Sequence, residues 1–117
     1  MDRNLTNFER DTVKKILEFE TELDAEDIKL FLTSLKVKDH KDNQEAGTYI
    51  NFSKNAISLE DCFLGNKVLA TINQKYEADF LLAVHNSQIN FLEIHVWDDN
   101  GEIILPTVVS YTIIENQ

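Results

Sequence analysis

The chain of 117 residues, 43% hydrophobic and 27% charged, is expected to form one globular domain over residues 1–117, and it lacks the apolar sequence that a secretory signal or a membrane span needs. Its formal net charge is −10, and the seven acids after Lys75 are accompanied by no lysine or arginine, which excludes nucleic acid as the expected partner and favours a basic one. Cys62 is the only cysteine and has no partner for an intramolecular disulfide, which favours a reducing, cytoplasmic location.

Two amphipathic helices are predicted at the N-terminal end. Thr6 and Glu9 have the spacing of a capping box, which predicts a helix over about residues 7–19. Asp24 is a favourable N-cap for a second helix over about residues 25–35, where apolar residues recur at the i, i+3, i+4 spacing. The two helices should form a hairpin. The acids of interest in its connection are Glu20, Glu22, Asp24, Glu26 and Asp27.

After residue 35 the spacing of the apolar residues changes from the helical period to the alternation typical of strands. Strands are predicted over residues 36–40, 47–52, 68–72, 78–85, 89–97 and 102–114. Residues 53–66 should be a loop that Ile57, Leu59 and Phe63 anchor to the core. The fold class that follows is α+β, with the helical hairpin packed on one face of a mainly antiparallel sheet of about five or six strands.

The two strongest strand signals flank a tight turn at Asn86–Ser87. Both strands have apolar residues on both faces, which predicts that something covers each side of the sheet. A simple two-residue turn would place Phe80 opposite Glu93 and Ala78 opposite His95. Glu93, His95 and Trp97 would share one face. His85 would lie at the other end of the hairpin from His95, so a metal site shared by the two is not expected.

Several segments resemble an uncharacterised family of small bacterial domains. The matching segments are Leu5–Arg10, Gly47–Tyr49 with Phe52, Asp79–Val84, the turn at Asn86–Ser87, Phe91–Glu93, and Pro106 with the strand that ends near Ile113. The family pattern has Asp-Gly at the hairpin turn and Gly after the Leu-Glu pair, where this chain has Asn86–Ser87 and Ile94. The resemblance implies a compact α+β fold and assigns no catalytic residue.

Glu93 is the most anomalous residue, because it is a carboxylate among apolar neighbours on a central strand. It could be a general acid or base. The favoured interpretation is a carboxylate that reaches solvent or is satisfied by the backbone or by Tyr49, Tyr76 or Lys75.

Two further candidates have plain structural explanations. Cys62 follows Glu60 and Asp61, whose negative field raises a thiol pKa and disfavours a nucleophile. Residues 98–101, Asp-Asp-Asn-Gly, lack the length and closing glutamate of a calcium loop and predict a hairpin turn. No motif for a cofactor or a metal is found, so none is expected.

Aromatic anchors beside acids are typical of a protein interface with a basic partner. The sequence therefore predicts a non-enzymatic binding protein, in its most specific form an immunity protein that neutralises a basic toxin, in particular a nuclease, by covering its cleft. Neither nucleic acid nor a membrane is an expected partner. Besides the five acids of the helical connection, the predicted partner-binding residues are Glu93, His95, Trp97, Asp98, Asp99 and Glu102.

Two alternatives remain open. One is a small-molecule-binding or enzymatic domain with a pocket around Glu93 and His95. The other is an adaptor module of a larger assembly. Burial of Glu93 and His95 together in a concave pocket would favour the first alternative, whereas an exposed flat patch would favour the protein interface.

Overall fold

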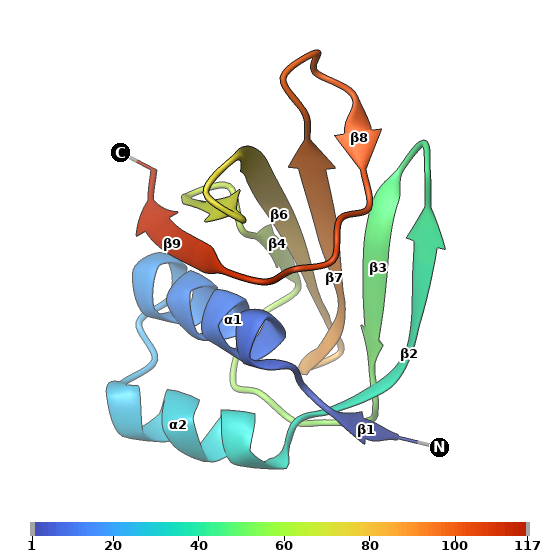
Figure 1. Ribbon diagram of the computed structural model, residues 1–117. Coiled ribbons are helices and arrows are strands. Elements are labelled where there is room, and N and C mark those ends of the chain that lie inside the picture. Colours follow the sequence, from blue (N-terminus) through green and yellow to red (C-terminus); the bar gives the residue numbers. More distant parts are fainter. Residues whose placement is uncertain (1, 117) are drawn as a thin grey trace.

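The structure is a computed structural model that describes residues 2–116, and over this range the chain forms two helices and nine strands (Figure 1). The helices are α1 (Asn7–Glu20) and α2 (Ala25–Ser34). The strands are β1 (Arg3–Asn4), β2 (Lys36–Asn43), β3 (Gly47–Phe52), β4 (Cys62–Leu64), β5 (Val68–Ile72), β6 (Tyr76–His85), β7 (Gln88–Trp97), β8 (Ile103–Ile104) and β9 (Tyr111–Glu115).

The side chains predicted to cap the helices do so. Thr6 Oγ1 accepts a hydrogen bond from the Glu9 amide at 3.1 Å, and Glu9 Oε1 accepts one from the Thr6 amide at 2.9 Å, so the capping box is complete. Asp24 Oδ1 accepts a hydrogen bond from the Asp27 amide at 2.8 Å. Each helix starts where the sequence predicts and ends within one residue of the expected position.

The strands form one antiparallel sheet in the order β1-β2-β3-β7-β6-β5-β9, with β4 paired to β6 and β8 paired to β7. Both helices pack on the same face of this sheet, on the near side in Figure 1. Phe8 of α1 contacts Phe80 on β6 and Tyr111 on β9, with ring centroids 6.0 Å and 5.1 Å apart. The predicted α+β architecture is confirmed, with more strands than expected.

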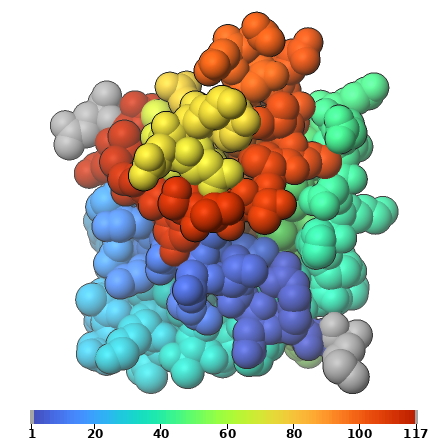
Figure 2. All heavy atoms as spheres, in the orientation of Figure 1, coloured from blue at the N-terminus to red at the C-terminus, as the bar shows by residue number. Residues whose placement is uncertain are grey.

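The extra strands are short and lie in segments with little apolar alternation. β4 lies within the predicted loop 53–66, where Ile57 is buried and Leu59 packs against the core as expected. Phe63 does not anchor the loop, because it pairs with Ala83 and is 69% exposed. The predicted strand over 102–114 is divided into β8 and β9, and residues 105–110 cross in front of the sheet between them (Figures 1 and 2).

The register of the β6–β7 hairpin differs by one residue from the prediction. Asp79, not Ala78, lies opposite His95, and Leu81, not Phe80, lies opposite Glu93. The cause is a β-bulge, since Ala83 pairs with Phe91 whereas the adjacent Val84 pairs with Ile89, which leaves Asn90 as the extra residue.

The bulge determines which side chains of β7 reach the core. Leu92, Ile94 and Val96 are buried on the helix side, whereas Phe91, Glu93, His95 and Trp97 lie on the opposite side. We call this opposite side the outer face. The prediction that something covers both sides of the central strands is wrong for the described residues, because both helices within 2–116 lie on one side.

Candidate functional site

Five side chains from three strands form a hydrogen-bonded row on the outer face, which we call the outer-face cluster. Its members are Tyr49 on β3, Glu93, His95 and Trp97 on β7, and Asp79 on β6. Cross-strand pairing brings them together, since Tyr49 lies opposite Glu93 and Asp79 lies opposite His95. Central strands of one sheet thus hold the cluster.

The hydrogen bonds run without a break from one end of the cluster to the other. Tyr49 Oη donates to Glu93 Oε1 at 2.7 Å, and His95 Nε2 lies 3.1 Å from the same oxygen. His95 Nδ1 lies 2.7 Å from Asp79 Oδ1, and Trp97 Nε1 donates to Asp79 Oδ2 at 3.1 Å. Ionised carboxylates only accept, so both histidine contacts are hydrogen bonds when both ring nitrogens hold protons.

The cluster is half-buried in an open surface. The side chains of Glu93, His95 and Asp79 are 15%, 22% and 45% exposed. The sequence named Tyr49 as one group that could satisfy Glu93, and the structure confirms that contact. Hydrogen bonding to Glu93, together with burial, raises the pKa of Tyr49 above its ordinary value. Glu93 is therefore a partnered carboxylate at a surface.

Gly47, the first residue of β3, allows the start of this strand to approach the outer-face cluster closely. Its φ is +90°, a left-handed conformation that favours glycine. A Cβ atom there would clash with the carbonyl oxygen of Ile94 and would lie 3.1 Å from Cδ2 of His95. The glycine thus keeps the imidazole packed beneath the β2–β3 turn.

The concave side of the sheet contains a separate cavity of about 710 Å³. Its lining includes Phe8, His40, Ile50 and Ile94. The crossing segment seen in Figure 2 contributes Leu105, Pro106, Val108 and Val109. Glu93 and His95 do not line this cavity, because they lie on the outer face. The alternative prediction of a pocket around these two residues gains no support.

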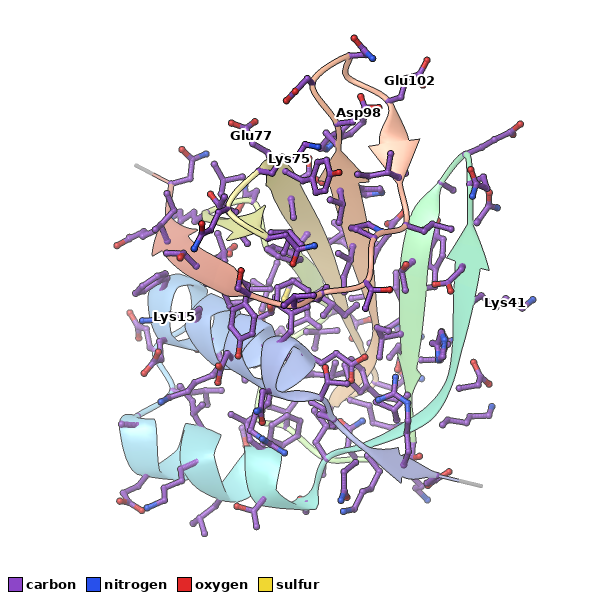
Figure 3. The ribbon with its side chains drawn as sticks, in the orientation of Figure 1. Lys15, Lys41, Lys75, Glu77, Asp98 and Glu102 are labelled. Carbon is purple, nitrogen blue, oxygen red and sulfur yellow. The ribbon has the colours of Figure 1, made fainter. Side chains whose placement is uncertain are left out.

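The acids at the end of the hairpin divide into two kinds. Asp98 closes the β7–β8 turn, where its Oδ1 accepts hydrogen bonds from the amides of Asn100 at 2.8 Å and Glu102 at 3.0 Å. Asp99 and Glu102 are exposed. Figure 3 shows Asp98 and Glu102 at the same end of the molecule as Glu77, an outer-face acid opposite Trp97.

The acids of the helical connection lie elsewhere, beside the helices and far from the β7–β8 turn in Figure 1. Glu20 is used within the fold, since its carboxylate accepts hydrogen bonds from the amides of Gly65 at 2.9 Å and Lys67 at 3.3 Å. Asp24 caps α2. Asp24 is exposed, as are Glu22, Glu26 and Asp27. The structure thus does not join the two predicted acidic regions into one surface.

The remaining candidates contribute no reactive centre. Burial, followed by the charges of Asp61, Glu20 and Glu60, raises the pKa of the Cys62 thiol. His85 is separated from His95 and contacts Asp61, with Nδ1 2.8 Å from Oδ2. Within residues 2–116 no group of three or more His, Cys, Asp or Glu side chains is arranged to hold a metal ion.

Sequence reasoning missed Asp79 because it placed Ala78 opposite His95. The alternation of apolar and polar residues along the two hairpin strands could have revealed the correct register. Residues that lie opposite each other share a face, so an apolar core residue such as Phe80 does not fit opposite Glu93. This conflict indicates that the strand contains an extra residue before position 93.

Comparison with family models, curated proteins and solved structures finds no match to this chain. The resemblance to a family of small bacterial domains therefore stays a prediction. Neither helix in the described range is long and apolar enough to cross a membrane.

Proposed function

We propose that this chain is a non-enzymatic binding protein whose outer sheet face binds a basic protein partner. The observation that carries the proposal is the outer-face cluster, in which two carboxylates are held beside Tyr49 and Trp97 on a face without a helix. Aromatic side chains on rigid strands provide contact area at low entropic cost, and adjacent acids favour cations.

The charge distribution supports a basic partner. On β6 and β7 the outer-face side chains with a fixed charge are Glu77, Asp79 and Glu93, all acidic. Asp99 and Glu102 extend this negative field at the end of the hairpin. Acids around an interface accelerate association with a basic surface, and a partly buried aromatic such as Trp97 slows dissociation.

The most specific form of the proposal is a cytoplasmic immunity protein that neutralises a toxin, in particular a nuclease. A nuclease needs a basic cleft for its phosphate substrate. A small acidic domain with a rigid open face is suited to cover such a cleft and exclude nucleic acid from it.

The test uses the basic nuclease encoded beside this chain, if the gene order provides one, with binding measured by stopped-flow kinetics and protection measured as residual nuclease activity. Glu77→Lys with Asp99→Lys should slow association at least about tenfold at low salt, because both charges lie on or beside the outer face. The matched pair Glu22→Lys with Glu26→Lys, exposed at the helical connection, should leave the rate nearly unchanged.

Two results would contradict the proposal. Loss of association only in the Glu22 and Glu26 pair would move the interface to the helical connection. Full protection by the Glu77 and Asp99 pair, with unchanged kinetics and salt dependence, would remove the electrostatic role of the outer face.

A second candidate function is small-molecule binding in the concave cavity of about 710 Å³, where His40, Asp42 and Thr48 are polar groups beside an apolar floor. Saturable shifts of these three residues on addition of a metabolite, with no protein complex, would favour it over the proposed interface. An adaptor role would instead require a complex without inhibition.

A further inference from the structure

A small depression of about 120 Å³ lies on the outer face beside the outer-face cluster. Trp97 and the carboxylates of Glu77 and Asp79 line one side, and aliphatic atoms of Leu69 and Ile114 line the other. Four strands, β5, β6, β7 and β9, therefore contribute an aromatic ring, two acids and an apolar surface to one concave site, which is a different kind of feature from a row of exposed acids.

The aromatic wall is fixed before any partner arrives. Trp97 Nε1 donates to Asp79 Oδ2, and Asp79 Oδ1 contacts His95, whose ring centroid lies 6.3 Å from that of Trp97. The indole is thus held from one edge and supported by a neighbouring ring. A ring held in this way needs little reorganisation to stack on a ligand.

The second acid is free to accept new hydrogen bonds. Glu77 lies directly opposite Trp97, is exposed, and has no hydrogen-bond or ion-pair partner among residues 2–116. Lys75, the last base of the chain, does not line the depression, because its Nζ lies over the ring of Tyr76, 5.0 Å from the centroid. The described structure thus leaves this carboxylate available.

We propose that this depression receives an arginine side chain of the basic partner, an assignment that rests on the proposed function of the outer face. A guanidinium can stack on the indole of Trp97 and donate two parallel hydrogen bonds to the Glu77 carboxylate. The methylene stem of arginine matches the aliphatic wall of Leu69 and Ile114. Lysine fits less well, because its ammonium is strongly hydrated and does not stack as a plane.

The test titrates the full chain with three short peptides, acetyl-Gly-X-Gly-amide, in which X is arginine, lysine or the neutral isostere citrulline. The chain has one tryptophan, so the indole N–H signal of Trp97 in a proton–nitrogen NMR spectrum reports on the depression without ambiguity. The arginine peptide should give a saturable shift with a dissociation constant on the order of 10 mM, the lysine peptide should bind at least about threefold more weakly, and citrulline should not saturate.

Variants locate the site. Glu77→Gln should weaken the arginine peptide at least about fivefold, whereas Glu22→Gln, which removes an exposed acid at the helical connection, should bind like the unmodified chain. Thr71→Lys places a cation beside Glu77 on the neighbouring strand and should abolish binding by filling the depression. It provides an independent test that keeps the Glu77 carboxylate.

Equal binding of the lysine peptide would overturn the choice of arginine, and equal binding of citrulline would overturn recognition of the charge. Unchanged binding in both Glu77→Gln and Thr71→Lys would overturn the site.

These outcomes differ from a failure of the proposed function. If the peptide does not bind but outer-face charge reversal still slows association with the partner, only the arginine site falls. If the peptide binds and charge reversal has no effect, the proposed interface falls.

Discussion

Glu9 shows how a single buried carboxylate can be structural in this protein. Its side chain is almost fully buried, yet it accepts hydrogen bonds from Arg3 at 2.8 and 2.9 Å and from the Thr6 amide at 2.9 Å. Burial alone would raise the pKa of Glu9, but the hydrogen bonds from Arg3 and Thr6 outweigh it and lower the pKa below its ordinary value of 4.5. The carboxylate therefore joins β1 to the start of α1 as an anion.

We expect Glu9→Gln to lower the free energy of unfolding by about 1–3 kcal/mol at neutral pH, because the charged pair with Arg3 is lost. Since the pKa of Glu9 is lower in the folded state, its contribution is fully present above about pH 4.5 and is lost as the pH falls through the lowered pKa. Urea unfolding over a pH series should therefore show the two proteins converging in acid.

The control is Glu18→Gln, which neutralises an exposed acid of the same helix. It should change stability by less than about 0.5 kcal/mol and should keep the pH dependence of the unmodified chain. A constant difference between Glu9→Gln and the unmodified chain down to strongly acidic pH would show that the side chain does not act through its charge.

Among the secondary-structure elements, the β6–β7 hairpin has a turn that is locally strained. Asn86 and Ser87 have φ of 55° and 57°, in the left-handed region. Asparagine tolerates this conformation, whereas serine does so less readily, and Asn-Gly is the preferred sequence for such a turn. The backbone of Ser87 has another role, because its carbonyl accepts a hydrogen bond from the Ile57 amide at 2.9 Å.

Ser87→Gly should therefore stabilise the chain by about 0.5–1 kcal/mol, since glycine adopts the turn without a Cβ penalty and keeps the carbonyl contact. Thermal unfolding followed by circular dichroism would measure this as a higher Tm. Ser58→Gly is the matched control, because Ser58 is exposed and lies outside the left-handed region, and it should be neutral or slightly destabilising. A loss of stability in Ser87→Gly would mean that the serine side chain holds the turn.

The same elements show what the sequence could and could not predict. Both helices follow from Thr6 and Asp24, because caps act within one turn and their geometry is local. Register depends on the whole ladder, so one extra residue at Asn90 changed the predicted partners beyond the bulge, whereas His85 and Gln88 at the turn end pair as predicted. The faces of Glu93 and Trp97 were predictable from alternation.

Other parts of the site depend on contacts between distant segments. The depression beside Trp97 needs Leu69 and Ile114 as well as the hairpin, and their positions follow from the pairing of β5 with β6 and β9. No local pattern specifies that pairing. The same reason explains Phe63, whose apolar character suggested burial although its strand presents it to the outer face.

At the scale of the whole molecule, the large net negative charge should lower the free energy of unfolding at low ionic strength. The net charge is −10 on a molecule with a radius of gyration of 13.6 Å. At about 0.01 M salt the screening length is about 30 Å, so acids repel one another across the entire fold, whereas at about 0.1 M it is about 10 Å. Folding compresses this charge and is opposed by the repulsion.

We expect the free energy of unfolding in urea, an uncharged denaturant, to rise by about 1 kcal/mol between about 0.01 M and about 0.1 M sodium chloride. The double variant Glu22→Lys with Glu26→Lys has less net charge and exposes both changes to solvent, so its rise should be smaller. A fall in stability with salt would indicate instead that close ion pairs such as Arg3–Glu9 outweigh the long-range repulsion.

The contact of α1 with β9 joins the beginning of the chain to its end. The tilted rings of Phe8 and Tyr111 pack together, and the Tyr111 hydroxyl donates to Asp11 at 2.6 Å, across 100 residues of sequence. During synthesis on the ribosome, the first helix therefore emerges long before the strand that covers it. We expect the part of the apolar face of α1 that Tyr111 contacts to stay exposed until β9 has been made, and this exposed surface can bind chaperones on the growing chain.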